Sequence, residues 1–317
     1  MKTDEVAAGM QVVHGHTQVP PGLRGAAVAI GNFDGVHRGH RALIAEAEAQ
    51  SRARRVPSAV MVFEPHPREF FQPDAQQFRL TPLTRKLVLF EQLGLDAAFV
   101  EPFDAELAAL SAEAFIERVL VAGLGVGHVV IGYDFYFGNK RGGNPEMMVR
   151  AGEDLGFGVT VMPPVAEDGE VFSSSAIRLH LAQGDVKGAA YMLGEPWRVQ
   201  GKVVGGAKRG TDLGFPTANV PMPKGTTLGH GIYAVRARFE GGTHNAAAYL
   251  GTRPTFDDGM PVLEVFLFDF TGDLYGRDIE VEFVDFIRGD RRFASADDLI
   301  VQMGQDIAKA RAILAKT

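Results

Sequence analysis

Short apolar runs alternate with helical patterns between Ala26 and about Gly194. This alternation is typical of a parallel α/β sheet, because a helix has to carry the chain back before each new parallel strand. Five runs have the character of buried strands: residues 26–31, 58–63, 96–103, 128–132 and 157–162. We therefore predict a doubly wound parallel sheet for the first half of the chain.

Capping residues mark the ends of several helices between these strands. The helix around residues 84–93 is expected to stop at Gly94, and Ser111 is expected to cap the helix that follows it. Asn144, followed by proline, starts a further helix that ends before Gly156. A last helix is predicted near residues 175–193.

The pattern changes after residue 194 to short strands separated by turns rich in glycine and proline. The candidate strands are residues 197–206, 217–222, 231–239, 245–251, 261–270 and 278–287. Glu240-Gly241-Gly242 is a hairpin signal, and Ser295 caps a closing amphipathic helix. We predict a six-stranded antiparallel β-barrel with a terminal helix, and place the domain boundary so that the domains are residues 1–186 and 187–317.

Length and composition agree with two domains and restrict the partners. A chain of 317 residues is about twice the usual domain size, although one large barrel has a similar length. The net charge of -7 has the wrong sign for binding nucleic acid or anionic membranes. With no cysteine, no apolar run long enough for a membrane span and no signal-peptide pattern, the expectation is a cytoplasmic protein. The sequence leaves its oligomeric state open.

The sharpest local signal is the string Gly31-Asn32-Phe33-Asp34-Gly35-Val36-His37-Arg38-Gly39-His40, which joins a strand to a helix. Ligands of open α/β sheets bind beyond the carboxyl ends of the strands, and a helix N-terminus there attracts phosphate. His37 and His40 are three residues apart, so they share a helix face and can both point at one phosphate. The alternative is a turn with two solvent-exposed histidines.

Three further segments of the first half are weaker candidates. Ser173-Ser174-Ser175 opens the last helix, and Arg178 lies three residues after Ser175; this is either a helix cap or a second anion clamp. His66 and the aromatic loop with Asp134 and Phe135 follow predicted strands, where they can bind a ligand or simply pack. The histidine pair without acidic or thiol partners makes a poor zinc site, and His14 and His16 are read as incidental.

In the second half, a glycine-rich segment joins two strands. It contains Gly205, Lys208, Gly210 and Gly214 and lacks the spacing of a Walker loop, but its amides and cations can surround a phosphate. Thr217 and Asn219 point to the same side of an extended chain, which offers two neutral oxygens to Mg²⁺ shared with ATP. An ordinary glycine-rich connection explains the same composition.

Glu264 interrupts an otherwise apolar strand. Alternation places Glu264, Phe266 and Phe268 on one face and Leu263 with its alternate neighbours on the other. Because both faces are apolar, this carboxylate is expected in a shielded space, as a general base or as one partner of a structural salt bridge.

Residues 31–40, 63–67, 132–138 and 173–178 together resemble the FMN adenylyltransferase module of bacterial bifunctional FAD synthetases, a Rossmann-like nucleotidyltransferase. The resemblance implies that ATP sits over Gly31–His40 and that His37 and His40 contact its phosphates. It also implies that Ser174, Ser175 and Arg178 hold the pyrophosphate end. Ser175 stands where the family usually has threonine, which keeps the hydroxyl.

Several strings of the second half resemble the riboflavin kinase domain, among them GKVV, GFPTAN, GTRPTF and LEVFLFDF. The resemblance makes Thr217 and Asn219 the Mg-ATP residues and Glu264 the base that deprotonates the ribityl 5′-hydroxyl. The whole chain is then expected to convert riboflavin to FMN and FMN to FAD, with ATP and Mg²⁺.

The chain departs from the kinase pattern at three positions. Tyr249 stands where the family often has asparagine, Phe266 replaces a frequent histidine, and Thr211 replaces a frequent arginine. They leave one rival hypothesis, a flavin-binding regulatory module whose kinase site is dead. A further rival is a nucleotidyltransferase for pantetheine phosphate or nicotinamide mononucleotide joined to an unrelated barrel. The PTAN string and Glu264 speak against both rivals.

Overall fold

The computed structural model describes residues 9–75, 78–205, 217–223, 225–240, 242–252 and 261–317. The chain groups into two compact units, one made of residues 1–77 and 81–173 and the other of residues 78–80 and 174–317. The helices of residues 174–193 thus lie in the second unit. The predicted domain boundary at residue 187 stays a prediction.

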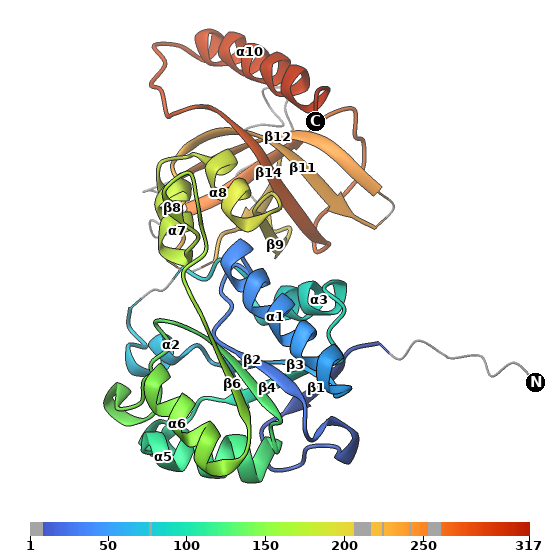
Figure 1. Ribbon diagram of the computed structural model, residues 1–317. Coiled ribbons are helices and arrows are strands. Elements are labelled where there is room, and N and C mark those ends of the chain that lie inside the picture. The colour runs from blue at the N-terminus through green and yellow to red at the C-terminus, as the bar shows by residue number, and fades with distance from the viewer. Residues whose placement is uncertain (1–8, 76–77, 206–216, 224, 241, 253–260) are drawn as a thin grey trace, which may run out of the picture. The chain divides into compact units, whose positions relative to one another are not determined.

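The first unit is built on a parallel sheet of six strands in the order β1-β4-β3-β2-β5-β6 (Figure 1). Its strands are β1 (Gln11–His14), β2 (Ala27–Ile30), β3 (Ser58–Glu64), β4 (Ala97–Pro102), β5 (His128–Gly132) and β6 (Gly158–Met162). The five predicted strands and the doubly wound sheet are confirmed. Strand β1 was not predicted, because only Val12 and Val13 of its four residues are apolar.

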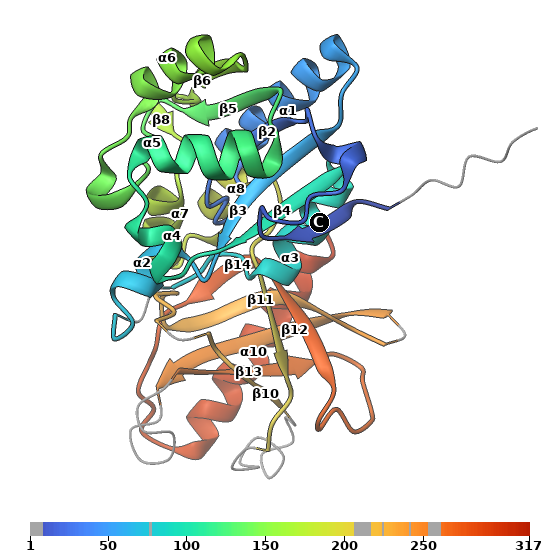
Figure 2. The same ribbon diagram turned by 90° about the horizontal axis from the view of Figure 1, so that it is seen from below.

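Helices cover both faces of this sheet (Figures 1 and 2). Ile44 and Phe90 are fully buried on one face, and Phe115 and Met148 are buried on the other. The helical segments are η1 (Pro21–Leu23), α1 (Arg38–Arg54), α2 (Pro67–Phe71), α3 (Leu83–Gln92), α4 (Ala105–Ala109), α5 (Ala112–Ala114), η2 (Phe115–Leu124), η3 (Asn139–Arg141) and α6 (Pro145–Leu155). A small hairpin of β7 (Ala166–Glu167) and β8 (Glu170–Val171) follows β6.

The order of the strands determines where a ligand can bind. From β2 the chain continues to β3 and β4 on one side, and β5 and β6 then add to the other side of β2. The strand order therefore reverses beside β2, and crevices for ligands form at such points, outside the carboxyl ends of the strands. The segment 31–37 leaves the end of β2 at this position.

The second unit contains an antiparallel sheet in the order β10-β13-β12-β11-β14-β9 (Figure 2). Its strands are β9 (Arg198–Lys202), β10 (Ala218–Pro221), β11 (Gly231–Phe239), β12 (Gly242–Thr252), β13 (Pro261–Leu267) and β14 (Asp278–Arg288). The backbone N–H of Val204 donates to the carbonyl of Asn219 at 2.9 Å, which joins the two edges of the sheet. This nearly closed six-stranded barrel confirms the predicted fold.

Successive residues of the strands point alternately into the barrel and outward. Tyr233, Leu263 and Val265 are fully buried inside. Outward residues, among them Ala247 and Phe268, pack under helix α10 (Ala296–Leu314), which lies against β11, β12 and β14. The Oγ atom of Ser295 accepts a hydrogen bond from the N–H of Asp298 at 3.1 Å, so the predicted cap of this helix is confirmed.

Two helices, α7 (Ser174–Ala182) and α8 (Val186–Leu193), stand where one was predicted. The single helix was wrong because Gly184 has a φ of 79° and Asp185 caps the second helix through the N–H of Gly188.

A three-residue piece of the first half also packs in the second unit. The indole N–H of Trp197 donates to the carbonyl of Leu80 at 3.0 Å, and the ring of Phe78 meets that of Trp197 edge to face at 5.5 Å.

Candidate functional sites

The loop after β2 has an unusual backbone that its own side chains hold in place. Phe33, Gly35 and Val36 have φ values of 49°, 97° and 45°, in the region that non-glycine residues rarely occupy. Phe33 and Val36 are completely buried, and Phe33 packs edge to face on Phe90 at 5.6 Å. Buried apolar side chains thus stabilise a strained loop, and such strain is concentrated at functional sites.

The two histidines of the loop lie against each other at the start of α1. The Nδ1 atom of His37 accepts a hydrogen bond from the backbone N–H of His40 at 3.3 Å, and the two rings stack with their centroids 3.6 Å apart. Because an accepting ring nitrogen carries no proton, His37 is neutral and keeps Nε2–H as its donor. Burial lowers the pKa of His37 to about 4.

His40 is also neutral. Its burial, with smaller effects from His37 and Lys86, lowers the pKa of His40 well below the ordinary value for histidine. Two neutral imidazoles at the first turn of a helix can donate N–H groups to an anion, and the helix dipole adds a favourable field.

Polar groups gather around this histidine pair. Among the described residues, the buried Oδ1 of Asn32 and Nδ1 of His40 have no hydrogen-bond partner. The ammonium of Lys86, a residue only 2% exposed, donates to the carbonyl of Asn32 at 2.8 Å. Asp34 is buried and accepts from the N–H of Thr81 at 3.1 Å, so it fixes the loop to the segment before α3. Unpartnered buried polar atoms of this kind are expected where a ligand completes the site.

Gly39 has a steric role in the same place. A Cβ atom on Gly39 would lie 3.1 Å from the His37 ring and 3.1 Å from the carbonyl oxygen of Phe172. Together with Gly31 at the end of β2, it leaves the backbone bare beside the histidines. The structure therefore brings Gly31, Asn32, Phe33, Asp34, Gly35, His37, Gly39 and His40 into one loop and one helix start, as predicted.

The weaker candidates of the first unit have local partners. The Nδ1 atom of His66 caps the short helix α2 by accepting from the N–H of Arg68 at 3.1 Å. Phe135 stacks on Phe137 with ring centroids 5.5 Å apart, and Asp134 is exposed in the same loop after β5. Both segments follow the carboxyl ends of strands, where ligands of such sheets bind. The flavin-binding role of His66, Asp134 and Phe135 stays a prediction.

Ser174, Ser175 and Arg178 lie on the first turns of α7 in the second unit. The Nε atom of Arg178 donates to the carbonyl of Phe78 at 2.8 Å, within that unit. Their predicted contact with the pyrophosphate end of ATP stays a prediction.

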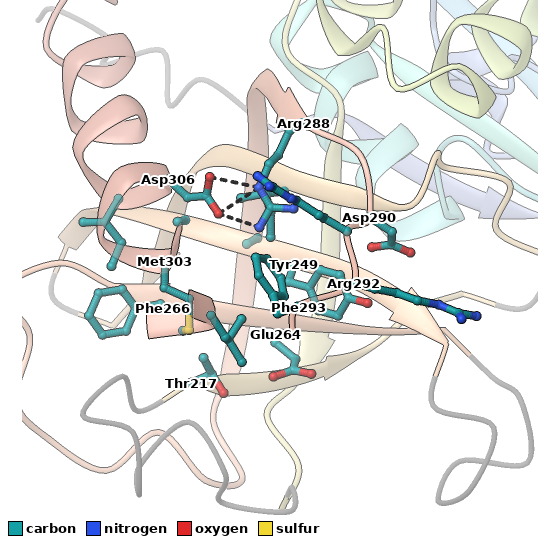
Figure 3. Close-up of a pocket in the computed structure, with 16 residues that line it drawn as sticks. Thr217, Tyr249, Glu264, Phe266, Arg288, Asp290, Arg292, Phe293, Met303 and Asp306 are labelled. Carbon is teal, nitrogen blue, oxygen red and sulfur yellow. Dashed lines mark hydrogen bonds and ion pairs between the residues drawn. The ribbon is translucent and has the colours of Figure 1, made fainter. Parts of the chain in front are cut away.

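A cavity of about 770 Å³ opens in the second unit between the outer face of the barrel and α10 (Figure 3). Its floor is formed by side chains of the strands, and its other walls come from α10 and the segment after β14. Most of its residues are apolar or aromatic, with polar groups placed among them. The lining includes Thr217, Ile232, Ala247, Tyr249, Glu264, Phe266, Arg288, Phe293, Met303 and Asp306.

Glu264 is half-buried and lies in this cavity. It faces Asn219 across the β10–β13 pair and Tyr249 across the β12–β13 pair, so the three side chains form one row on the outer face of the sheet. Asn219 is only 5% exposed, and Thr217 lines the cavity. The guanidinium of Arg288, at the end of β14, donates three hydrogen bonds of 2.7 to 3.0 Å to the carboxylate oxygens of Asp306.

Part of the predicted kinase site lies outside the described residues, namely Lys208, Gly210 and Gly214, together with Thr211. Gly205 is described and exposed. Sequence reasoning missed Lys86, because its position in an amphipathic helix gives no sign that its ammonium reaches a loop. It also missed the wall of the cavity on α10 and after β14, since no pattern indicated which strands that helix would cover.

The first unit has the fold of the nucleotidyltransferases, and the second unit is an antiparallel barrel with a ligand-sized cavity under its last helix. Residues 20–176 match the family model of FAD synthetase, and residues 193–314 match that of riboflavin kinase. A bifunctional riboflavin kinase/FMN adenylyltransferase of Pseudomonas fluorescens is 41% identical over 307 residues, which cover 96% of this chain and 98% of that protein. One of Haemophilus influenzae is 40% identical over 304 residues and covers 96% and 99%.

The chain belongs to the family of bifunctional riboflavin kinase/FMN adenylyltransferases. A crystal structure of a Streptococcus pneumoniae protein described as a macrolide-efflux protein has a TM-score of 0.82 and 27% identity, and covers 95% of this chain and 99% of that chain. In the part of the chain that the structure describes, no helix is both long and apolar enough to cross a bilayer.

Proposed function

We propose that the cavity of the second unit binds riboflavin and that Glu264 takes the proton from its ribityl 5′-hydroxyl as that oxygen attacks the γ-phosphorus of ATP. The products are FMN and ADP. The observation that carries the proposal is the row in which Glu264 stands beside Asn219 within a largely apolar cavity. An alcohol is a weak nucleophile at neutral pH, so this reaction needs a base within reach, and Glu264 is a carboxylate on the cavity floor.

The residues beside Glu264 suit a nucleotide bound with Mg²⁺. Thr217 and Asn219 offer neutral oxygens two positions apart on one face, and the phosphates of ATP supply the negative charge that such a shared site needs. No cluster of three acidic, histidine or cysteine side chains that could hold a metal by itself occurs among the described residues. When bound, Mg²⁺ would neutralise charge on the phosphates, and Gly205, Lys208, Gly210 and Gly214 are proposed to contact them.

In the first unit we place the transfer of AMP from ATP to FMN, which gives FAD and pyrophosphate. The phosphate of FMN is already a nucleophile, so this step needs charge stabilisation rather than a base. The neutral His37 and His40 at the start of α1 donate N–H groups to the phosphates of ATP, and Lys86 supplies a buried positive charge beside them. Ser174, Ser175 and Arg178 are proposed to bind the leaving pyrophosphate, and His66, Asp134 and Phe135 the flavin.

The test is a comparison of two variants in two assays. In Glu264→Gln, FMN formation from riboflavin is expected to fall by about 100-fold or more, because general-base catalysis is lost, while FAD formation from supplied FMN continues. In His40→Ala, FAD formation is expected to fall by about 100-fold and FMN formation to continue. Glu240→Gln, which changes an exposed carboxylate in the β11–β12 turn, is the control.

The same assays decide between the proposal and its rivals. A wild-type protein that makes no FMN from riboflavin would be a flavin-binding module with a dead kinase site. A protein that makes FMN but no FAD would have another acceptor in its first unit. Full kinase activity in Glu264→Gln would remove Glu264 from the catalytic role.

A further inference from the structure

Glu264 has different neighbours on its two flanks. On the β10 side stand Asn219 and, one diagonal step away, Thr217, which are the proposed nucleotide residues. On the β12 side stands Tyr249, directly opposite Glu264 in the register. Directly paired residues on one face of a sheet have their Cβ atoms about 5 Å apart. A substrate hydroxyl that meets Glu264 from the side away from the nucleotide therefore passes Tyr249.

The side chain of Tyr249 runs along its own strand. It lies over Gly251, the next residue of β12 on the same face, and a Cβ atom placed on Gly251 would be 2.1 Å from the Tyr249 hydroxyl oxygen. Gly251 is not among the described residues with positive φ, so its backbone does not require glycine. A side chain added at Gly251 would therefore have to displace the phenol of Tyr249.

The segment after β14 brings Phe293 to this cavity together with the charged side chains of Asp290, Arg291 and Arg292. The close-up shows the phenol of Tyr249 inside the cavity between Glu264 and that segment (Figure 3). A phenol presents an apolar ring and one hydroxyl that both donates and accepts. This combination suits an acceptor with a planar ring and a hydroxylated chain.

We infer that Tyr249 is a positioning residue for the acceptor. The phenol of Tyr249 holds the hydroxylated chain of the acceptor so that the terminal hydroxyl of that chain faces Glu264. The inference rests on the proposed kinase function of this cavity. Gly251 contributes to this positioning, because the absence of a side chain at Gly251 leaves the space in which the phenol lies. The role concerns binding of the acceptor and does not extend to binding of ATP.

The test separates the phenol from the glycine beneath it. Tyr249→Phe is expected to weaken riboflavin binding, measured by flavin fluorescence and as KM, by about threefold to tenfold, which corresponds to one lost hydrogen bond. The KM for ATP should stay unchanged. Gly251→Ala should weaken riboflavin binding to a similar extent, because the added methyl group displaces the phenol.

A double variant provides the decisive comparison. Once the side chain is removed in Tyr249→Ala, adding Gly251→Ala should have no further effect on riboflavin binding. Gly304→Ala, in which the new methyl group meets no atom within 4 Å, is the matched glycine control. Trp197 fluorescence in every variant reports whether the second unit is folded.

Two results would overturn the inference. One is an unchanged riboflavin KM in both Tyr249→Phe and Tyr249→Ala. The other is an equal effect of Gly251→Ala with and without the tyrosine, which would show that the methyl group acts on the backbone alone. A failure of the proposed function is distinguishable, since Glu264→Gln would then keep full kinase activity.

Discussion

His37 caps α1 with an unprotonated ring nitrogen, and this use of histidine makes the first site sensitive to acid. A cap hydrogen bond to Nδ1 exists only while that nitrogen carries no proton, and burial lowers the pKa of His37 to about 4. The unfolded chain has an ordinary histidine pKa of about 6.5. Between these values the unfolded state binds more protons than the folded state, so stability falls as the pH falls from 6.5 toward 4.

We predict that His37 accounts for about 2 kcal/mol of lost stability on going from pH 7 to pH 5, since each unit of pKa difference corresponds to about 1.4 kcal/mol. Urea unfolding at the two pH values measures this loss. The loss should be smaller in His37→Gln, whereas His14→Gln, a change at an exposed histidine of the same unit, should behave as wild type. An equal pH effect in wild type and His37→Gln would contradict the prediction.

At the scale of single residues, the sequence predicted the candidate site residues whose arrangement depends on neighbours along the chain. His37 and His40 are three positions apart at a strand-to-helix junction, and that spacing alone places them on one helix face. Lys86 was not predicted, because it comes more than 40 residues later and its contact with the Asn32 carbonyl depends on how α3 packs on the sheet. The partnership of Tyr249 with Gly251 depends on the direction of a side chain, which alternation does not give.

Among the elements, α10 has the clearest dependence on one capping residue. The Oγ atom of Ser295 accepts the N–H of Asp298, and both acidic residues of the first turn suit the helix dipole. We predict that Ser295→Ala destabilises the second unit by about 1 kcal/mol and weakens riboflavin binding, because α10 forms a wall of the cavity. Ser295→Asp keeps a capping oxygen and should retain most of the stability.

Urea unfolding and flavin fluorescence titration of the two variants would check this. Identical riboflavin affinity in Ser295→Ala and wild type, despite a measured loss of stability, would show that the wall of the cavity does not depend on the cap.

Elements with strong periodicity could be predicted from sequence, and weak ones could not. The five apolar runs of the first half and the six of the second all became strands. Strand β1 contributes two apolar residues and is recognisable only by its pairing with β4. The turn at Gly184 and Asp185 lies inside an apolar helical pattern. Because this pattern continues on both sides of the turn, the sequence did not predict the division into α7 and α8.

At the scale of the whole molecule, the order of residues in the sequence and their grouping in space differ. Phe78 is 3% exposed and packs on Trp197 in the second unit, although it comes 119 positions earlier in the chain. Trp197 is the one tryptophan of the sequence, so its fluorescence reports on that unit alone. A boundary read from composition as a single point could not reveal this packing.

We predict that Phe78→Ala destabilises the second unit by about 3 kcal/mol, a typical loss for a buried phenylalanine. The midpoint of the unfolding transition followed by Trp197 fluorescence should fall accordingly. Phe71→Ala, a change at a phenylalanine that is 63% exposed, should leave that midpoint in place. An unshifted midpoint in Phe78→Ala would mean that this contact adds nothing to the stability of the unit.

The place of α10 in the chain has a consequence for biosynthesis. The outward side chains of Ala247, Phe266 and Phe268 are made before the helix that covers them, since α10 follows all six strands of the barrel. A growing chain that has completed its barrel therefore shows an uncovered aromatic surface to the cell until residues 296–314 emerge from the ribosome. Such surfaces recruit chaperones or promote aggregation.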